Sequence, residues 1–415
     1  MLKILHFSDA HIDMANFGRH DPVSGLPLRV MDFLNSLDEI IESAITENVD
    51  LVIFAGDTYK DRSPAPTFQR EWGKRIMRLS HAKIPAILLT GNHDMSPALN
   101  RAHAIHEFET LDVPYIHVVS KPAILVPADL NGLPIQVIAL PWVFRSSRMA
   151  ALDVSAEKSV DLMEDLETNL THFVQASLEH KVKKDLPVIL TAHASIAGAE
   201  IGTERTIMLG KDLVLSPGLV KDPRLSYVAL GHIHKAQDLN KGHQPPVIYP
   251  GSIERVDFGE AEDKKFFVIA QVEFGKDTVV RWCELKHIRT FIDLSVELIG
   301  DQDVNQKIQA VLPSSERLEG AIVRLVINYP REIEKMIDES SLRALLDPAF
   351  EFHLVKRPQI NSRIRIPEGR ETSSLMPIEL LEIYWKEIHL ENDTIEKLTP
   401  LSKQIIDTVE SGKQD

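Results

Sequence analysis

The stretch IPAILLTGNHD, from Ile84 to Asp94, is an apolar run that ends abruptly in four polar or turn-forming residues. Two earlier stretches have the same form, LKILHFSDAH over residues 2–11 and LVIFAGD over residues 51–57. A short apolar run bounded by turn residues is typical of a buried strand. We therefore expect three strands, each followed directly by polar side chains.

Helical segments separate these three strands. Apolar residues recur at helical spacing over Val30–Ile45 and Thr67–Leu79, and the second segment follows the breaker Ser63–Pro66. Strand–helix alternation predicts parallel strands covered by helices. Ligands of such sheets gather beyond the carboxyl ends of the strands, so the three polar clusters are expected to meet there.

The next part of the chain repeats the pattern with shorter strands and a helical stretch over Val160–His180. The strands are expected at Ile135–Leu140, Val188–Leu190, Tyr227–Leu230, Val247–Tyr249 and Phe266–Val272, the last of them antiparallel. We predict an α/β domain over residues 1–287, a four-layer sandwich of two mixed sheets flanked by helices.

After Thr290 the pattern of apolar and polar residues changes, which predicts a small α/β domain over residues 288–375. Its strands are expected at Phe291–Leu298, Ala321–Ile327 and Glu351–Val355, and its helices at Val304–Leu312 and Glu332–Leu346. Residues 376–415 are expected to form a helical tail, with helices at Ile378–Glu387 and Asp393–Glu410.

Composition limits the class of protein. Of 415 residues, 44% are hydrophobic and 26% charged, as in ordinary globular proteins, and no apolar run approaches the roughly 20 residues of a membrane span. The single cysteine, Cys283, excludes an internal disulfide and favours a cytoplasmic location. The net charge of −15 argues mildly against tight unaided DNA binding. The basic stretch Lys356–Arg370 is either a solvated face or a contact to a DNA backbone.

Five clusters of metal-ligand residues follow one order along the chain. They are Asp9-x-His11, Gly56-Asp57, Gly91-Asn92-His93-Asp94, His193 and Gly231-His232-Ile233-His234. Taken singly, each has an ordinary structural explanation, such as a helix cap, a turn or a core histidine. Together they supply oxygen and nitrogen donors for two divalent ions that share a carboxylate, the arrangement used for attack on phosphate esters.

These clusters resemble the calcineurin-like metallophosphoesterase superfamily, whose pattern is D-x-H, G-D, G-N-H-[DE], H and G-H-x-H. The start Ser8–His11, together with Tyr249–Arg255 and Asp257–Glu260, is similar to one branch, the SbcD/Mre-type DNA repair nucleases. The resemblance is specific over residues 1–285. It implies a capping domain over 290–375 and helices that dock on a coiled-coil ATPase over 376–415.

The resemblance also implies roles for individual residues. The first ion would be held by Asp9, His11, Asp57 and His234. The second ion would be held by Asp57, Asn92, His193 and His232, so that Asp57 bridges the two. His93 would assist the leaving group, oriented by Asp94. One departure is Lys60, where archaeal members have a histidine.

The resemblance implies a manganese-dependent DNA phosphodiesterase, a 3′–5′ exonuclease and hairpin-opening endonuclease, that works with an SbcC-type ATPase in DNA repair. Its partners would be DNA, that ATPase and, as an open alternative, a second copy of the chain, with no membrane. The rival interpretation is a stand-alone phosphoesterase for small phosphodiesters or phosphoproteins. A scaffold subunit with an inactive site is a further alternative, against which the complete ligand set argues.

Overall fold

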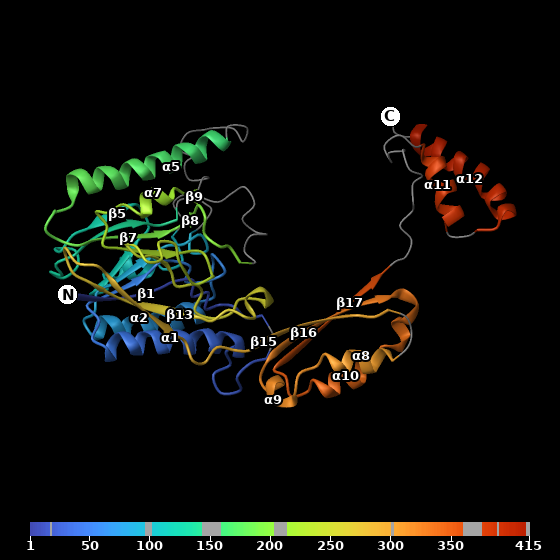
Figure 1. Cartoon of the computed structure of the whole chain (residues 1–415), viewed down its shortest axis with the longest axis horizontal. Coiled ribbons are helices and arrows are strands. Elements are labelled where there is room, and N and C mark those ends of the chain that lie inside the picture. The colour runs from blue at the N-terminus through green and yellow to red at the C-terminus, as the bar shows by residue number, and fades with distance from the viewer. Residues whose placement is uncertain are drawn as a thin grey trace. The chain divides into compact units, whose positions relative to one another are not determined.

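We describe a computed structural model of the chain (Figure 1). It describes residues 1–16, 19–95, 102–142, 159–202, 214–299, 303–359, 376–387 and 390–411. The chain divides into two compact units. The first comprises residues 1–293, 319–323 and 349–351, and the second comprises residues 294–318, 324–348 and 352–415. The division into three domains at residues 287 and 375 stays a prediction.

The first sheet of unit 1 is built around the three strands expected from the clusters. Its order is β14-β13-β1-β2-β3-β4. The strands are β1 (Leu2–Phe7), β2 (Leu51–Phe54), β3 (Ala86–Leu89), β4 (Ile116–Val119), β13 (Phe266–Val272) and β14 (Val279–Glu284). Strands β1 to β4 are parallel, and β13 returns antiparallel beside β1, as predicted. The edge strands β4 and β14 were not predicted.

The second sheet has the order β11-β12-β10-β7-β6-β5 and is also mixed. Its strands are β5 (Ala123–Leu125), β6 (Gln136–Leu140), β7 (Val188–His193), β10 (Tyr227–Gly231), β11 (Gln237–Asp238) and β12 (Val247–Tyr249). A short parallel pair, β8 (Ser195–Ile196) and β9 (Val214–Leu215), lies apart from it. Strand β7 is longer than predicted and ends at His193.

Alternation along the strands produces the layers of unit 1. In β1, Leu5 and Phe7 join one apolar core with α1 (Leu28–Thr46) and α2 (Pro66–His81), whereas Ile4 joins a core between the two sheets. Helix α5 (Ser159–Ala176) covers the outer face of the second sheet (Figure 1). The predicted four-layer sandwich is therefore confirmed.

Short elements complete unit 1 and connect its layers. They are α3 (His106–Thr110), the π-helical turn η2 (Ser177–Lys181), α7 (Pro217–Val220) and the 3-10 turn η3 (Phe258–Glu260). His6 is buried between the sheets, and its imidazole nitrogens lie 3.0 Å from the Tyr227 hydroxyl and 3.1 Å from the Leu230 carbonyl oxygen. Both contacts make it a structural histidine.

The second unit is based on a three-stranded sheet of order β15-β16-β17. Its elements are β15 (Phe291–Glu297), α8 (Val304–Ala310), α9 (Ser315–Leu318), β16 (Ile322–Pro330), η4 (Arg331–Met336), α10 (Glu339–Leu345) and β17 (Glu351–Gln359). The single helix expected over Glu332–Leu346 is wrong. Asp338 accepts a hydrogen bond from the Ser341 amide at 3.0 Å and starts a new helix, because a capping side chain satisfies an end amide.

The tail forms two helices that pack on each other, α11 (Pro377–Glu387) and α12 (Asn392–Ser411), close to their predicted bounds. Of the basic stretch, Lys356 is held by Glu334 and Glu339 at 3.1 and 2.9 Å, so its charge is already paired. Arg363, Arg365 and Arg370 lie outside the described residues. Among the described helices, none is long and apolar enough to cross a membrane.

Candidate metal centre

The predicted ligands lie at the carboxyl ends of strands from both sheets. Asp9, Asp57 and Asn92 follow β1, β2 and β3 of the first sheet. His193 is the last residue of β7, and His232 follows β10, in the second sheet. Because the sheets pack face to face, two sets of strand ends converge at one place, as the parallel topology predicts.

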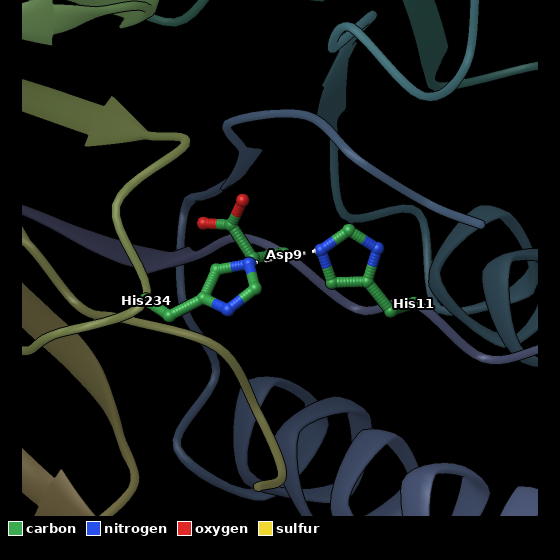
Figure 2. A group of neighbouring side chains, drawn as sticks. All are labelled: Asp9, His11 and His234. Carbon is green, nitrogen blue, oxygen red and sulfur yellow. Dashed lines mark hydrogen bonds between the residues drawn. The ribbon is translucent and has the colours of Figure 1, made fainter. Parts of the chain in front are cut away.

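A first group of donors consists of Asp9, His11 and His234 (Figure 2). One donor atom from each lies within 4.8 Å of the others. The Nε2 atoms of the two imidazoles face each other at 3.1 Å. Two imidazoles and a carboxylate at this spacing can bind one divalent ion.

A second group consists of Asp57, His193 and His232, with donor atoms again within 4.8 Å of one another. The Asn92 amide oxygen lies 3.0 Å from His193 Nε2 and 3.0 Å from His232 Nδ1. Asp57 Oδ2 lies 3.4 Å from His193 Nε2 and 3.9 Å from His11 Nε2 of the first group. That carboxylate therefore stands between the groups, where a bridging ligand would be required.

The backbone at these positions is strained. Asp9, His11, Asp57 and His232 have φ values of 52°, 39°, 63° and 104°, in the left-handed region that side-chain-bearing residues seldom adopt. Such conformations persist where the surrounding structure enforces them, and they concentrate at functional sites. Gly91 is required for a related reason, since a Cβ there would lie 2.1 Å from Asp57 Oδ1.

Outer hydrogen bonds fix the orientation of two imidazoles. His193 Nδ1 donates to the Ala55 carbonyl oxygen at 2.7 Å, which leaves Nε2 for a metal. His234 Nδ1 donates to Glu260 at 2.8 Å, and Glu260 also accepts from the buried Lys265 at 2.6 Å. Partners of this kind are usual for metal-ligating histidines.

Sequence reasoning placed Glu260 within a family motif but did not assign it this contact. Only the general rule that a ligating histidine seeks a carboxylate could have suggested it.

The electrostatics favour a cation. Burial raises the pKa of Asp9. Burial opposes ionisation of Asp57 too, yet the neighbouring His193 and His93 hold its pKa well below the usual range. Although burial lowers the pKa of His193, the carboxylates of Asp57 and Asp9 raise it to about 9. Carboxylates that stabilise a proton so strongly would also stabilise a metal ion.

The donor set fits two divalent ions. Asp9 and Asp57 are almost fully buried, and among the described residues no lysine or arginine forms an ion pair with either. The imidazoles of His193 and His11 are the nearest cationic partners of Asp57. Divalent cations would neutralise the two buried carboxylates more fully than protonated imidazoles can. Carboxylate, amide and imidazole donors suit hard to borderline metals, and no thiolate is present in the groups.

The part assigned to Asp94 is corrected. Its carboxylate accepts hydrogen bonds from the amides of Asp57, Thr58 and Gly91, each at 2.9 Å, and it makes no hydrogen bond to His93. The His93 imidazole instead donates from Nδ1 to the Lys60 carbonyl oxygen at 2.7 Å. Asp94 thus holds together the loops that follow β2 and β3, because three main-chain amides of these loops donate to it.

Three further residues border the centre. Trp142 packs against His232 and His193, with ring centroids 5.0 and 6.1 Å apart. Lys60 and Arg62 line a pocket of about 730 Å³ together with His93. The pocket therefore places two cationic side chains next to the residue predicted to assist the leaving group.

Comparison with known proteins agrees with this geometry. The model of the calcineurin-like phosphoesterase family matches residues 2–236. The chain is 27% identical to the SbcD subunit of the nuclease SbcCD from Rhodobacter capsulatus over 84% of both chains, and 28% identical to that of Escherichia coli K12 over 66% of both. It is 23% identical to the DNA double-strand break repair protein Mre11 of Archaeoglobus fulgidus, over 63% of this chain and 52% of that one.

The family match covers more than half of the chain and includes every residue of the two donor groups. The relatives confirm the resemblance to SbcD/Mre-type proteins. Family and donor groups together support an enzyme that uses two divalent metal ions to hydrolyse phosphate esters. The chain belongs to the calcineurin-like phosphoesterase family.

Proposed function

We propose that this chain is a manganese-dependent DNA phosphodiesterase and the nuclease subunit of an SbcCD-like complex. It degrades DNA from the 3′ side and cuts hairpins and ends endonucleolytically, in the cytoplasm, during DNA repair. The observation that carries the proposal is the position of Asp57 between two donor groups, in a chain similar over 84% of its length to a nuclease subunit. Manganese is favoured because the donors are oxygen and imidazole nitrogen.

The residues divide the work as follows. Asp9, His11, Asp57 and His234 would hold the first ion. Asp57, Asn92, His193 and His232 would hold the second. When bound, two divalent ions neutralise a phosphodiester and activate water for in-line attack. His93 supplies a proton to the leaving group, with its ring fixed by the Lys60 carbonyl oxygen.

The pocket beside His93 offers two cationic side chains to a phosphate, although Asp13 and Asp61 line it as well. Lys60 and Arg62 line it, and the Lys60 side chain is exposed. A lysine acts on phosphate as a mobile point charge, and an arginine can contact two phosphate oxygens at once. We assign these two side chains to the phosphates that flank the cleaved bond.

The helical tail supports an ATPase partner. Leu401 and Ile405 of α12 are one turn apart and 56% and 64% exposed. Exposed apolar residues at this spacing suit docking on another helix or a coiled coil. We assign this face to docking on an SbcC-type ATPase. We also propose that two copies of this chain associate within that assembly.

Three substrates test the proposal: 3′-labelled duplex DNA, hairpin DNA and a chromogenic phosphodiester. The expected result is manganese-dependent cleavage of all three, with duplex shortened from the 3′ end. Cleavage of the small ester alone, with DNA untouched even beside the ATPase, would favour the stand-alone phosphoesterase. Asp57→Asn, made in parallel, shows that any cleavage belongs to this centre.

A further inference from the structure

A third group of potential ligands lies outside the dinuclear centre. His103, His106 and Glu109 bring one donor atom each within 4.8 Å of one another. They follow a three-residue spacing, and helix α3 begins at His106. His103 lies in the turn before the helix, where its carbonyl oxygen accepts from the His106 amide at 3.1 Å, and Glu109 follows His106 by three residues within the helix. A local segment of seven residues is therefore enough to build the group.

The separations fit a single tetrahedral ion. His103 Nε2 and His106 Nδ1 are 3.2 Å apart, and Glu109 Oε2 lies 3.8 and 3.7 Å from these two nitrogens. Zinc binds imidazole and carboxylate at about 2.0–2.2 Å, which places tetrahedral ligands about 3.3–3.6 Å apart. All three separations lie close to that range before any ion draws the ligands together.

A hydrogen bond between the two imidazoles could account for the shortest separation alone. It does not place a carboxylate oxygen nearly equally far from both nitrogens, at ion-pair distance from each, as Glu109 Oε2 is. His103 is only 9% exposed, so burial holds its imidazole beside the other two donors.

The group is also accessible to solvent. The side chains of His106 and Glu109 are 44% and 54% exposed. His103 and His106 line a surface pocket of about 720 Å³. An ion can therefore enter without disturbing the core, and its fourth position is open to water.

We propose that His103, His106 and Glu109 form a third metal site, suited to Zn²⁺, that is separate from the dinuclear centre. Its role follows from one hydrogen bond: the Ala104 amide donates to the Asp94 carbonyl oxygen at 2.9 Å. Ala104 and Ile105 are buried in the core shared with α1 and α2. The ion clamps this segment and thereby the loop that ends in Asp94.

The test compares the full chain with the double variant His106→Ala/Glu109→Gln. The side chains of both substituted residues are substantially exposed. His81→Ala, which changes an exposed histidine outside every donor group, is the control. Each protein is stripped of metal, incubated with excess zinc, desalted and analysed by mass spectrometry. The double variant should retain one zinc fewer per chain than the wild type and the control.

Hydrogen exchange gives a second measure. Zinc should slow exchange across residues 102–111 of the wild type and leave the double variant unchanged in that segment. Equal zinc content in the double variant and the wild type would overturn the proposal, as would loss of more than one ion. Equal protection of the segment in both proteins would mean that the three residues form only a cluster of one hydrogen bond and two ion pairs, and would also overturn the proposal.

Discussion

The metal centre and the helical tail depart from ordinary burial in opposite directions. Asp9, Asp57 and His193 are polar yet almost completely buried. In the tail, Met376, Tyr384, Leu401 and Ile405 are apolar yet 41–64% exposed. Buried polar groups and exposed apolar groups are the informative exceptions to the burial rule.

The two exceptions indicate different partners. A buried carboxylate costs free energy until a cation neutralises it, so the first region is completed by ions. Apolar surface exposed to water costs free energy until another surface covers it, so we expect a protein partner to cover the second region. The predictions below test whether each region behaves as its exception implies, in order of decreasing effect on small-substrate hydrolysis.

The largest effect is expected from Asp57→Asn. The amide keeps the shape of the side chain but removes the charge that both ions share, so both should be lost. Manganese-dependent hydrolysis of a chromogenic phosphodiester should then fall by about 1000-fold, equivalent to about 4 kcal/mol. Metal content measured by mass spectrometry checks the cause. Two retained ions with near-normal turnover would remove Asp57 from its bridging position.

The fold of unit 1 was largely predictable because its strands are continuous apolar runs that end in polar turns. The edge strand β14 escaped prediction because Val279 is exposed and Arg281 and Glu284 interrupt the apolar pattern. The helix over Glu332–Leu346 failed for a local reason, since the Asp338 cap outweighs the apolar spacing around it.

The site was predictable in its members and less so in its hydrogen bonds. The order of the clusters along the sequence identified seven candidate ligands, and the fold brings them together. Which of them bind an ion stays a proposal. The role of Asp94 depends on the strained backbone of Asp57. The role of Glu260 depends on its contact with His234, which lies 26 residues earlier in the sequence. Neither feature leaves a periodic signal in the sequence.

His93→Ala should have the next largest effect and should separate chemistry from metal binding. The imidazole belongs to neither donor group, so both ions should remain. Loss of a general acid should lower kcat by about 100-fold or more. Metal content and kcat, measured on one preparation, check this expectation. If the variant instead loses metal, His93 is a ligand and the division of roles between Asn92 and His93 fails.

Glu260→Gln should weaken the binding of one ion only, and therefore tests whether the two ion sites in the buried region are independent. The amide orients His234 less firmly, so affinity for the first ion should fall by about 10- to 100-fold. Manganese titration with one weakened site and one unchanged site is the expected result.

The same substitution leaves Lys265 buried without its counter-ion, which threatens the fold. The double variant Glu260→Gln/Lys265→Met removes both charges and serves as the control for stability. Unchanged affinity at both sites in a folded double variant would show that the Glu260 contact does not tune the metal centre.

Lys60→Ala should have a smaller effect still, because the side chain is exposed. Its carbonyl oxygen, which holds His93, remains in place, so kcat should be nearly unchanged. An exposed charge is worth up to about 1 kcal/mol, so KM for a DNA substrate should rise by about 5-fold. A fall in kcat with constant KM would assign Lys60 to the chemical step.

Deletion of residues 376–415 should have no effect on hydrolysis of the small substrate. This result tests most directly whether the exposed apolar residues of the tail serve a partner and not the metal centre. The two helices bury Trp385 but leave much of their apolar surface exposed, so they contribute little to a core of their own. The truncated chain should remain folded and manganese-active on the chromogenic ester. It should no longer co-purify with an SbcC-type ATPase, and ATP-dependent cutting of DNA ends should be lost.

A matched variant, Leu401→Glu/Ile405→Glu, places charges on the exposed face without shortening the chain and should reproduce the loss of the partner. A deletion that aggregates or loses ester hydrolysis would show that the exposed apolar residues cover this protein's own core, and that only the buried polar residues mark a functional site.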